Sequence, residues 1–231
     1  MLKTTVLITR PRGAAERLRA ALGPGVATVV SPVLRIVPVA GVAAVAGDVV
    51  LTSVAGAGLA GDGRGRVAWC VGERTAEAAR AAGFDARSSN GDADALVRMI
   101  LDAAPAGRLT HLRGEASAGD VAARLAAGGV ACDAAVVYEQ VAQAPTPEAV
   151  ALLAGSRPVI APLYSPRSAV ILFAAGPFAA PVTVIAMSRA VADAVPDGGS
   201  ARIIVAPNPD GKAMLRAILA ELRGTASPLG A

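Results

Sequence analysis

Two apolar stretches that end in hydroxyl side chains constrain the fold of this chain more than any other feature. Residues 48–53 read DVVLTS, and residues 159–165 read VIAPLYS. Pro166 follows the second stretch, and proline cannot extend a central strand but suits the first turn of a helix. The second stretch therefore predicts a strand that passes into a helix over 167–174. In open α/β sheets ligands bind at the carboxyl ends of strands, and helix N-termini attract anions.

The similarity between the two stretches continues downstream. Residues 71–78 resemble residues 186–193, and residues 95–101 resemble residues 213–219. Three matched pairs of segments in the same order indicate an internal duplication. Because the repeat is near half of the chain, it predicts two related α/β units rather than a solenoid.

Two long extended segments set the expected domain boundaries. Residues 31–39 and 134–142 are both unusually long for one strand, and prolines 32 and 38 suit an edge strand or a linker. We expect the two segments to pair, so that two mostly parallel, flavodoxin- or Rossmann-like sheets are joined by a two-stranded extended connection. The predicted division is an inserted α/β domain over 38–137, a discontinuous α/β domain over 1–33 plus 143–231, and a connection over 34–37 and 138–142. Five strands are available to each domain.

Charge and composition exclude nucleic acid as the expected partner. The chain of 231 residues has a formal net charge of +4, carried almost entirely by arginine, because Lys3 and Lys212 are its lysines. No cluster of basic residues occurs, and aromatic residues make up 3%, too few to stack bases along a surface. A mild excess of planar guanidinium groups instead suits carboxylate or phosphate ligands.

The cysteines and the histidine give weak support to metal or thiol chemistry. Cys70 and Cys132 lie far apart in apolar, strand-like runs, which is typical of buried reduced thiols. No CxxC motif occurs, and His111 is the sole histidine, in a short strand pattern. We therefore expect no metal site, and we expect His111 to be a packed or half-exposed strand residue.

One uncharged stretch of the chain could be read as a membrane-spanning segment. Residues 169–187 carry no charge and are about as long as a bilayer span. However, Gly176, Pro177 and Pro181 divide the stretch, which favours a helix, a turn and a strand. The N-terminus begins a strand with no signal-peptide pattern. We expect a cytoplasmic protein with no membrane partner.

A glycine pattern raises nucleotide binding as an alternative. Gly56, Gly58 and Gly61 form GxGxxG after a predicted strand. A dinucleotide fold needs a full helix directly after these glycines. Here Val67 already starts the next strand, which leaves room for a short helix or a turn. An NAD-type oxidoreductase therefore stays a weaker alternative.

The remaining polar candidates lie at the carboxyl ends of predicted strands in both halves. Taken singly, each is typical of a helix cap or a solvated turn. Taken together, they predict a cleft between the two domains that binds a polyanion. The candidate binding residues are Arg10, Thr52, Ser53, Thr75, Arg113, Ser165, Ser168 and Ser188. Tyr138, on the predicted connection, is either a packing residue or a phenol that donates a hydrogen bond or a proton in the cleft.

These residues together resemble the uroporphyrinogen-III synthase family over nearly the whole chain. The resemblance rests on segments in the family's order: 6–11 (VLITRP), 49–53 (VVLTS), 71–76 (VGERTA), 112–114 (LRG), 136–138 (VVY) and 165–169 (SPRSA). The sequence departs from the family after Ser53, where VAGAG replaces a segment that often carries Asn-Ala-Val and a longer helix.

The resemblance implies a lyase of tetrapyrrole and heme biosynthesis that uses no metal or organic cofactor. Its substrate would be the linear tetrapyrrole hydroxymethylbilane, which loses water and closes as uroporphyrinogen III with the last pyrrole ring inverted. Tyr138 would be the candidate catalytic acid, because hydroxide is a poor leaving group. The sequence carries no oligomer signal, and we expect a monomer. The alternatives are a non-catalytic two-domain module that binds a small anionic ligand, and a family member that has lost catalysis.

Overall fold

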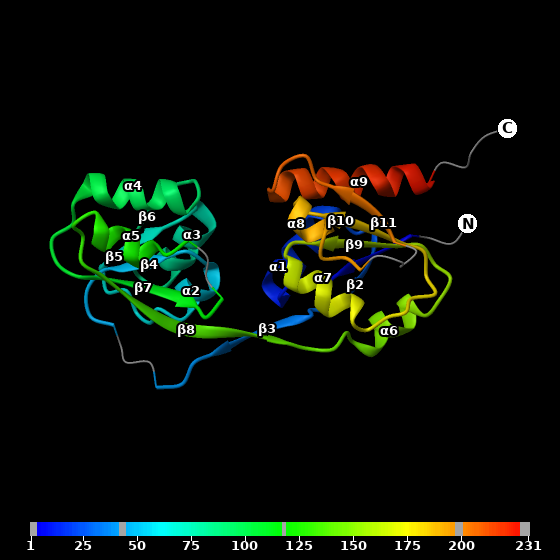
Figure 1. Cartoon of the computed structure of the whole chain (residues 1–231), viewed down its shortest axis with the longest axis horizontal. Coiled ribbons are helices and arrows are strands. Elements are labelled where there is room, and N and C mark those ends of the chain that lie inside the picture. Colours follow the sequence, from blue (N-terminus) through cyan, green and yellow to red (C-terminus); the bar gives the residue numbers. More distant parts are fainter. Residues whose placement is uncertain (1–3, 42–44, 117–118, 197–200, 227–231) are drawn as a thin grey trace. The chain divides into compact units, whose positions relative to one another are not determined.

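The chain divides into two compact units in a computed structural model that describes residues 4–41, 45–116, 119–196 and 201–226 (Figure 1). Unit 1 comprises residues 1–35 and 141–231, and unit 2 comprises residues 36–140. The chain passes between the units in two strands, β3 (Leu34–Pro38) and β8 (Cys132–Ala142). We retain as a proposal that each unit is a separate domain.

Unit 1 is a parallel five-stranded sheet with helices on both faces. The strand order is β11-β10-β9-β1-β2, and neighbouring strands pair in parallel. Helices α1 and α9 cover one face, and α6, α7 and α8 cover the other. The strands are β1 (Thr5–Ile8), β2 (Ala27–Val30), β9 (Val159–Leu163), β10 (Val182–Ala186) and β11 (Arg202–Val205), and the helices are α1 (Arg12–Leu22), α6 (Pro147–Leu153), α7 (Pro166–Phe173), α8 (Arg189–Ala192) and α9 (Gly211–Ala226).

Unit 2 has a six-stranded sheet in the order β3-β8-β7-β4-β5-β6. Helices α2 and α3 pack on one face, and α4 and α5 pack on the other (Figure 1). Besides β3 and β8, the strands are β4 (Val49–Leu51), β5 (Val67–Cys70), β6 (Asp85–Ser88) and β7 (Leu109–Gly114), and the helices are α2 (Val54–Gly58), α3 (Glu73–Ala81), α4 (Ala93–Ala103) and α5 (Val121–Ala127).

The expectation of five strands in each unit is wrong for unit 2. The backbone N–H of Val39 donates to the Val137 carbonyl, and that of Gln143 donates to the Val33 carbonyl, each at 3.0 Å. These bonds show that β3 and β8 are antiparallel, because the chain near the end of β3 pairs with the middle of β8, and the chain before β3 pairs with the residue after β8. Strand β3 therefore forms the edge of the sheet of unit 2. The prolines that suggested an edge strand or a linker are consistent with this place.

The internal duplication corresponds to equal strand orders in the two sheets. The order β2-β1-β9-β10-β11 of unit 1 matches β8-β7-β4-β5-β6 of unit 2. The matched sequence segments end β4 and β9, begin α3 and α8, and lie within α4 and α9. Consequently each sheet reverses its direction of winding at an equivalent point, between β1 and β9 in unit 1 and between β7 and β4 in unit 2. Ligands of open α/β sheets bind at such points.

The central strands are apolar because both of their faces are covered. All four residues of β1 and all five of β9 are buried, as expected of parallel strands between two helical layers. The uncharged stretch 169–187 consists of most of α7, a connection and β10, which confirms the predicted helix, turn and strand. In the part of the chain that the structure describes, no helix is both long enough and apolar enough to cross a bilayer.

Candidate active site

Residues from three strands of unit 2 meet where the sheet reverses its direction of winding. Ser53 follows β4 and is the N-cap of α2, where its Oγ accepts a hydrogen bond from the backbone N–H of Gly56 at 2.9 Å. Gly56 also lets α2 approach β7, because a Cβ at that position would lie 2.9 Å from the carbonyl oxygen of Leu112 in β7. The first turn of α2 is thereby packed closely against the carboxyl half of β7.

Tyr138 of β8 completes this group of residues. Its hydroxyl donates a hydrogen bond to Ser53 Oγ at 3.1 Å, and its side chain is 7% exposed. An irregularity in the pairing of β7 with β8 places it there, because Arg113 pairs with Val136 while Gly114 pairs with Tyr138. One residue of β8 is skipped, which is a β-bulge, and bulges commonly re-aim side chains near functional sites.

Ser53 can donate a hydrogen bond to a ligand while it holds Tyr138. A hydroxyl group accepts two hydrogen bonds and donates one. The N–H of Gly56 and the hydroxyl of Tyr138 use both acceptor positions of Ser53. Among the residues that the structure describes, the Ser53 hydroxyl donates no hydrogen bond. The three groups therefore form a chain of hydrogen bonds that ends in an available O–H donor.

Thr52 has a partner that the sequence did not reveal. Its Oγ1 lies 3.1 Å from Nε2 of His111, which is 2% exposed in β7. Burial, followed by the charge of Arg113, lowers the pKa of His111 to about 4. The imidazole is therefore neutral at physiological pH and fixes the Thr52 hydroxyl through a neutral hydrogen bond. Alternation along the strand is the signal that could have revealed this pair. His111 pairs with Val50, and Thr52 lies two residues after Val50, so all three side chains are on the same face of the sheet.

The other candidates of unit 2 have structural contacts. The guanidinium group of Arg113 donates to the carbonyl oxygens of Gly114 and Glu115 at 3.1 and 3.0 Å. Thr75 is buried in the first turn of α3, with 5% of its surface exposed. Arg113 thus braces the end of β7, and Thr75 is a packed helix residue.

A second group of candidates lies at the equivalent point of unit 1. Ser165 is the N-cap of α7, where its Oγ accepts a hydrogen bond from the backbone N–H of Ser168 at 3.1 Å and lies 2.8 Å from the Ser168 hydroxyl. Arg10, which follows β1, places its guanidinium carbon 3.9 Å from the centre of the Tyr164 ring. Burial raises the pKa of Tyr164, and the charge of Arg10 opposes that rise. The sequence had not singled out Tyr164.

Ser188 stands apart from this second group. It is the N-cap of α8 and is half-buried, but its hydroxyl does not cap a backbone N–H. The structure therefore brings Arg10, Ser165 and Ser168 close to the ends of β1 and β9, and it places Ser188 after β10.

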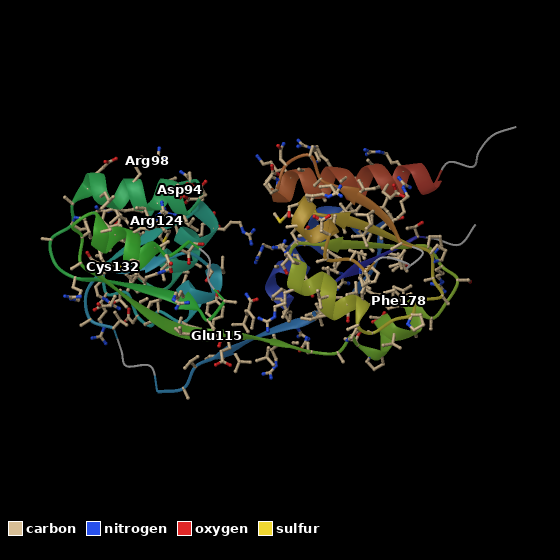
Figure 2. All side chains as sticks on the ribbon, viewed as in Figure 1. Asp94, Arg98, Glu115, Arg124, Cys132 and Phe178 are labelled. Atoms are coloured by element: carbon tan, nitrogen blue, oxygen red, sulfur yellow. The ribbon has the colours of Figure 1, made fainter. Side chains whose placement is uncertain are left out.

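The two cysteines lie outside these groups. Burial raises the pKa of Cys70 to about 12 and raises the pKa of Cys132, and neither forms a disulfide. Cys132 begins β8, whereas Glu115 follows the carboxyl end of the parallel neighbour β7, so the two lie at opposite ends of these strands (Figure 2). Within the described residues, no group of three or more histidine, cysteine or acidic side chains could hold a metal ion.

The glycine pattern after β4 does not form a dinucleotide site. Gly56 and Gly58 lie inside the five-residue helix α2, and Gly61 has a φ of 73° in the turn that follows. The long helix that would carry a pyrophosphate at its N-terminus is absent between β4 and β5. The structure therefore agrees with the prediction of a short helix and a turn.

The fold and these groups define a class of protein: duplicated α/β units that present hydroxyl and N–H donors at the switch points of two sheets. The family model described as uroporphyrinogen-III synthase HemD matches residues 14–216. The chain belongs to the uroporphyrinogen-III synthase family, and it is an enzyme of tetrapyrrole synthesis. This confirms the resemblance on which the sequence analysis relied.

A solved structure of the family has the same fold. The uroporphyrinogen-III synthetase of Helicobacter pylori has a TM-score of 0.67 at 14% identity, over 96% of this chain and 100% of that one. A mutant uroporphyrinogen III synthase from Thermus thermophilus has a TM-score of 0.46 at 17% identity, over 96% of this chain and 99% of that one. The wild-type enzyme has a TM-score of 0.40 at 18% identity, over 97% of this chain and 100% of that one. No curated protein sequence matches the chain.

Proposed function

We propose that this chain is a hydro-lyase that converts hydroxymethylbilane to uroporphyrinogen III, with loss of water and inversion of the terminal pyrrole ring. The observation that carries the proposal is the family match over residues 14–216. The hydrogen-bonded pair of Tyr138 and Ser53 at the switch point of unit 2 supports it, because departure of hydroxide from the substrate needs a proton donor.

The first chemical step is the loss of the terminal hydroxyl. Ser53 donates its proton to the leaving oxygen, and Tyr138 donates its own proton to Ser53. The carbon–oxygen bond breaks with its electron pair on oxygen, and water departs. The pyrrole that carried the hydroxymethyl group, at the opposite end of the chain from the ring that inverts, becomes a cationic azafulvene. The phenolate of Tyr138 recovers a proton when the closing macrocycle releases one from the pyrrole carbon that has formed the new bond. No co-reactant is needed for this balance.

The second task is to control which ring closure follows. The azafulvene is a strong electrophile, and unassisted closure gives the uninverted isomer. The enzyme must hold the chain so that the spiro geometry leading to inversion is favoured, which is a matter of orientation rather than of further acid or base groups. We therefore expect single substitutions, including those of Tyr138, to reduce the rate rather than abolish it.

Anchoring of the carboxylates of the substrate supplies this orientation. In unit 1, Arg10 contributes positive charge, and Ser165 and Ser168 contribute hydroxyls at the first turn of α7. In unit 2, the Thr52 hydroxyl is held by neutral His111. These groups need no metal or organic cofactor to bind carboxylates. Thr75, Arg113 and Ser188 are weaker candidates. Thr75 is buried in α3, the guanidinium group of Arg113 donates to backbone carbonyls, and Ser188 lies apart from the other hydroxyls after β10.

The test is an isomer assay. Hydroxymethylbilane is generated enzymatically, this protein is added, the products are oxidised, and uroporphyrins I and III are separated by chromatography. We expect type III to dominate with the wild-type protein and with Arg108→Gln, an exposed control at the amino end of β7. Type I alone, formed at the rate seen without protein, would overturn the proposal and favour an anion-binding module.

A further inference from the structure

We infer that Gly114 is a positioning residue for the reaction, because its missing side chain is what allows the Tyr138 hydroxyl to reach Ser53. This inference rests on the proposed function and adds to it a residue that carries no reactive group.

The β-bulge sets Tyr138 directly beside Gly114. Strands β7 and β8 pair regularly from Leu109 with Cys132 to Arg113 with Val136, and the pairing then shifts so that Gly114 faces Tyr138. The backbone N–H of Glu115 donates to the Tyr138 carbonyl at 3.0 Å, which fixes the main chain on the far side of the bulge. The backbone of Tyr138 is therefore held in place, and its side chain is the part that can move.

The tyrosine ring occupies the space that a side chain at position 114 would need. A Cβ on Gly114 would lie 2.6 Å from Cε2, 2.7 Å from Cζ and 2.9 Å from the hydroxyl oxygen of Tyr138. Ordinary carbon contacts begin near 3.4 Å. All three atoms belong to the hydroxyl end of the ring. A methyl group at position 114 would therefore displace the end of the side chain that bonds to Ser53.

The backbone conformation of Gly114 does not itself require glycine. Its φ lies outside the left-handed region, in contrast to Gly119 and Gly129, whose φ values are 96° and 89°. An alanine at position 114 would meet no backbone strain of the kind that an alanine at those two positions would meet. The requirement for glycine is thus one of space, and the group that fills the space is the ring of Tyr138.

Displacement of the ring breaks the hydrogen bond rather than weakening it slightly. The Tyr138–Ser53 distance is already 3.1 Å, and a bond between hydroxyls is lost beyond about 3.5 Å. If the ring moves away from position 114 by most of an ångström, the Tyr138 hydroxyl can no longer donate a proton to Ser53. Binding of the carboxylates by other residues is unaffected, so the turnover number falls and KM stays unchanged.

The experiment is a double-mutant cycle with Gly114→Ala and Tyr138→Phe in the full chain, read as kcat, KM and the fraction of type III isomer. We expect each single variant to lose about tenfold in kcat, as for the loss of one hydrogen bond to Ser53, and the double variant to lose no more than either single variant. Gly58→Ala is the matched control, because a Cβ there meets nothing within 4 Å.

Two outcomes would overturn the inference. One is a wild-type kcat for Gly114→Ala. The other is a double variant whose loss is the product of the two single losses, near a hundredfold, because Gly114 would then act independently of the Tyr138 hydroxyl. In both cases the wild-type protein still makes type III isomer, so the proposed function stands. A wild-type protein that makes type I alone instead refutes the proposed function.

Thermal unfolding keeps the inference testable if Gly114→Ala folds poorly. Because the ring is the obstacle, we expect Gly114→Ala to lower Tm in the wild-type chain and to have little effect on Tm in a Tyr138→Leu chain, which lacks the ring atoms at close range. An equal loss of Tm in both chains would show that the methyl group meets something else, and would contradict the steric argument.

Discussion

Burial of His111 beside Thr52 makes the stability of unit 2 depend on pH in a definite direction. The imidazole is 2% exposed, and its pKa falls from 6.5 to about 4 because burial disfavours its charged form. In the unfolded chain His111 binds a proton as the pH falls below about 6.5, whereas the folded chain binds it only near pH 4. The free energy of unfolding therefore decreases as the pH falls through this window.

The size of the effect follows from the two pKa values. With 6.5 in the unfolded chain and about 4 in the folded chain, the loss between pH 7 and pH 5 is about 2 kcal/mol. The loss approaches about 3 kcal/mol below pH 4, where it no longer grows. A difference of 2 kcal/mol is a large part of the stability of an ordinary domain.

Urea unfolding at pH 7 and pH 5, followed by tryptophan fluorescence, measures this quantity. Trp69 is the single tryptophan and is buried in β5, so its emission reports on unit 2. His111→Gln is the matched variant, because glutamine can hydrogen-bond to Thr52 but does not titrate. We expect about 2 kcal/mol less dependence on pH in the variant. An equal pH dependence in both proteins would refute the assignment of a buried neutral imidazole.

Three further predictions test other parts of the structure. Gly56→Ala brings a Cβ to 2.9 Å from the backbone oxygen of Leu112, so its Tm should fall in a thermal scan, whereas Gly58→Ala, in open space, should not lose stability; equal Tm values would contradict the close packing of α2. Ser165→Ala removes the cap of α7 and should cost about 1 kcal/mol in urea unfolding and raise KM, and an unchanged KM would remove Ser165 from substrate binding. Cys70, buried and with a pKa raised to about 12, should react with a thiol reagent at pH 8 only as fast as the native protein opens, and rapid labelling of Cys70 without unfolding would contradict its burial.

The local signals of the sequence predicted the strand and helix pairs well. An apolar run followed by a hydroxyl residue and Pro166 predicted β9 and α7, and the structure shows Ser165 as the N-cap of that helix. The internal duplication also predicted two related sheets, because matched segments of sequence must occupy matched elements of structure. These features depend on residues close together in the chain, where periodicity and capping are visible in the sequence.

The arrangement of the candidate site could not be predicted in the same way. The bulge that pairs Gly114 with Tyr138 depends on a shift in register between β7 and β8. No pattern of residues in the sequence predicts such a shift. The bond between His111 and Thr52 joins residues from different strands, and it becomes visible only when the neighbours β4 and β7 are known. The prolines of β3 indicated an edge strand or a linker and its pairing with β8 was expected, but the sequence did not show that β3 is a sixth strand of the sheet of unit 2.

The isomer composition of the product in the first minutes of reaction tests the central claim most directly. Hydroxymethylbilane is held at a fixed concentration while the amount of this protein is varied, and the oxidised uroporphyrins are separated. The account predicts that the initial rate of type III formation rises in proportion to the protein concentration and that Tyr138→Phe lowers the slope about tenfold without removing it. A type III rate that does not change with the amount of protein would contradict the account.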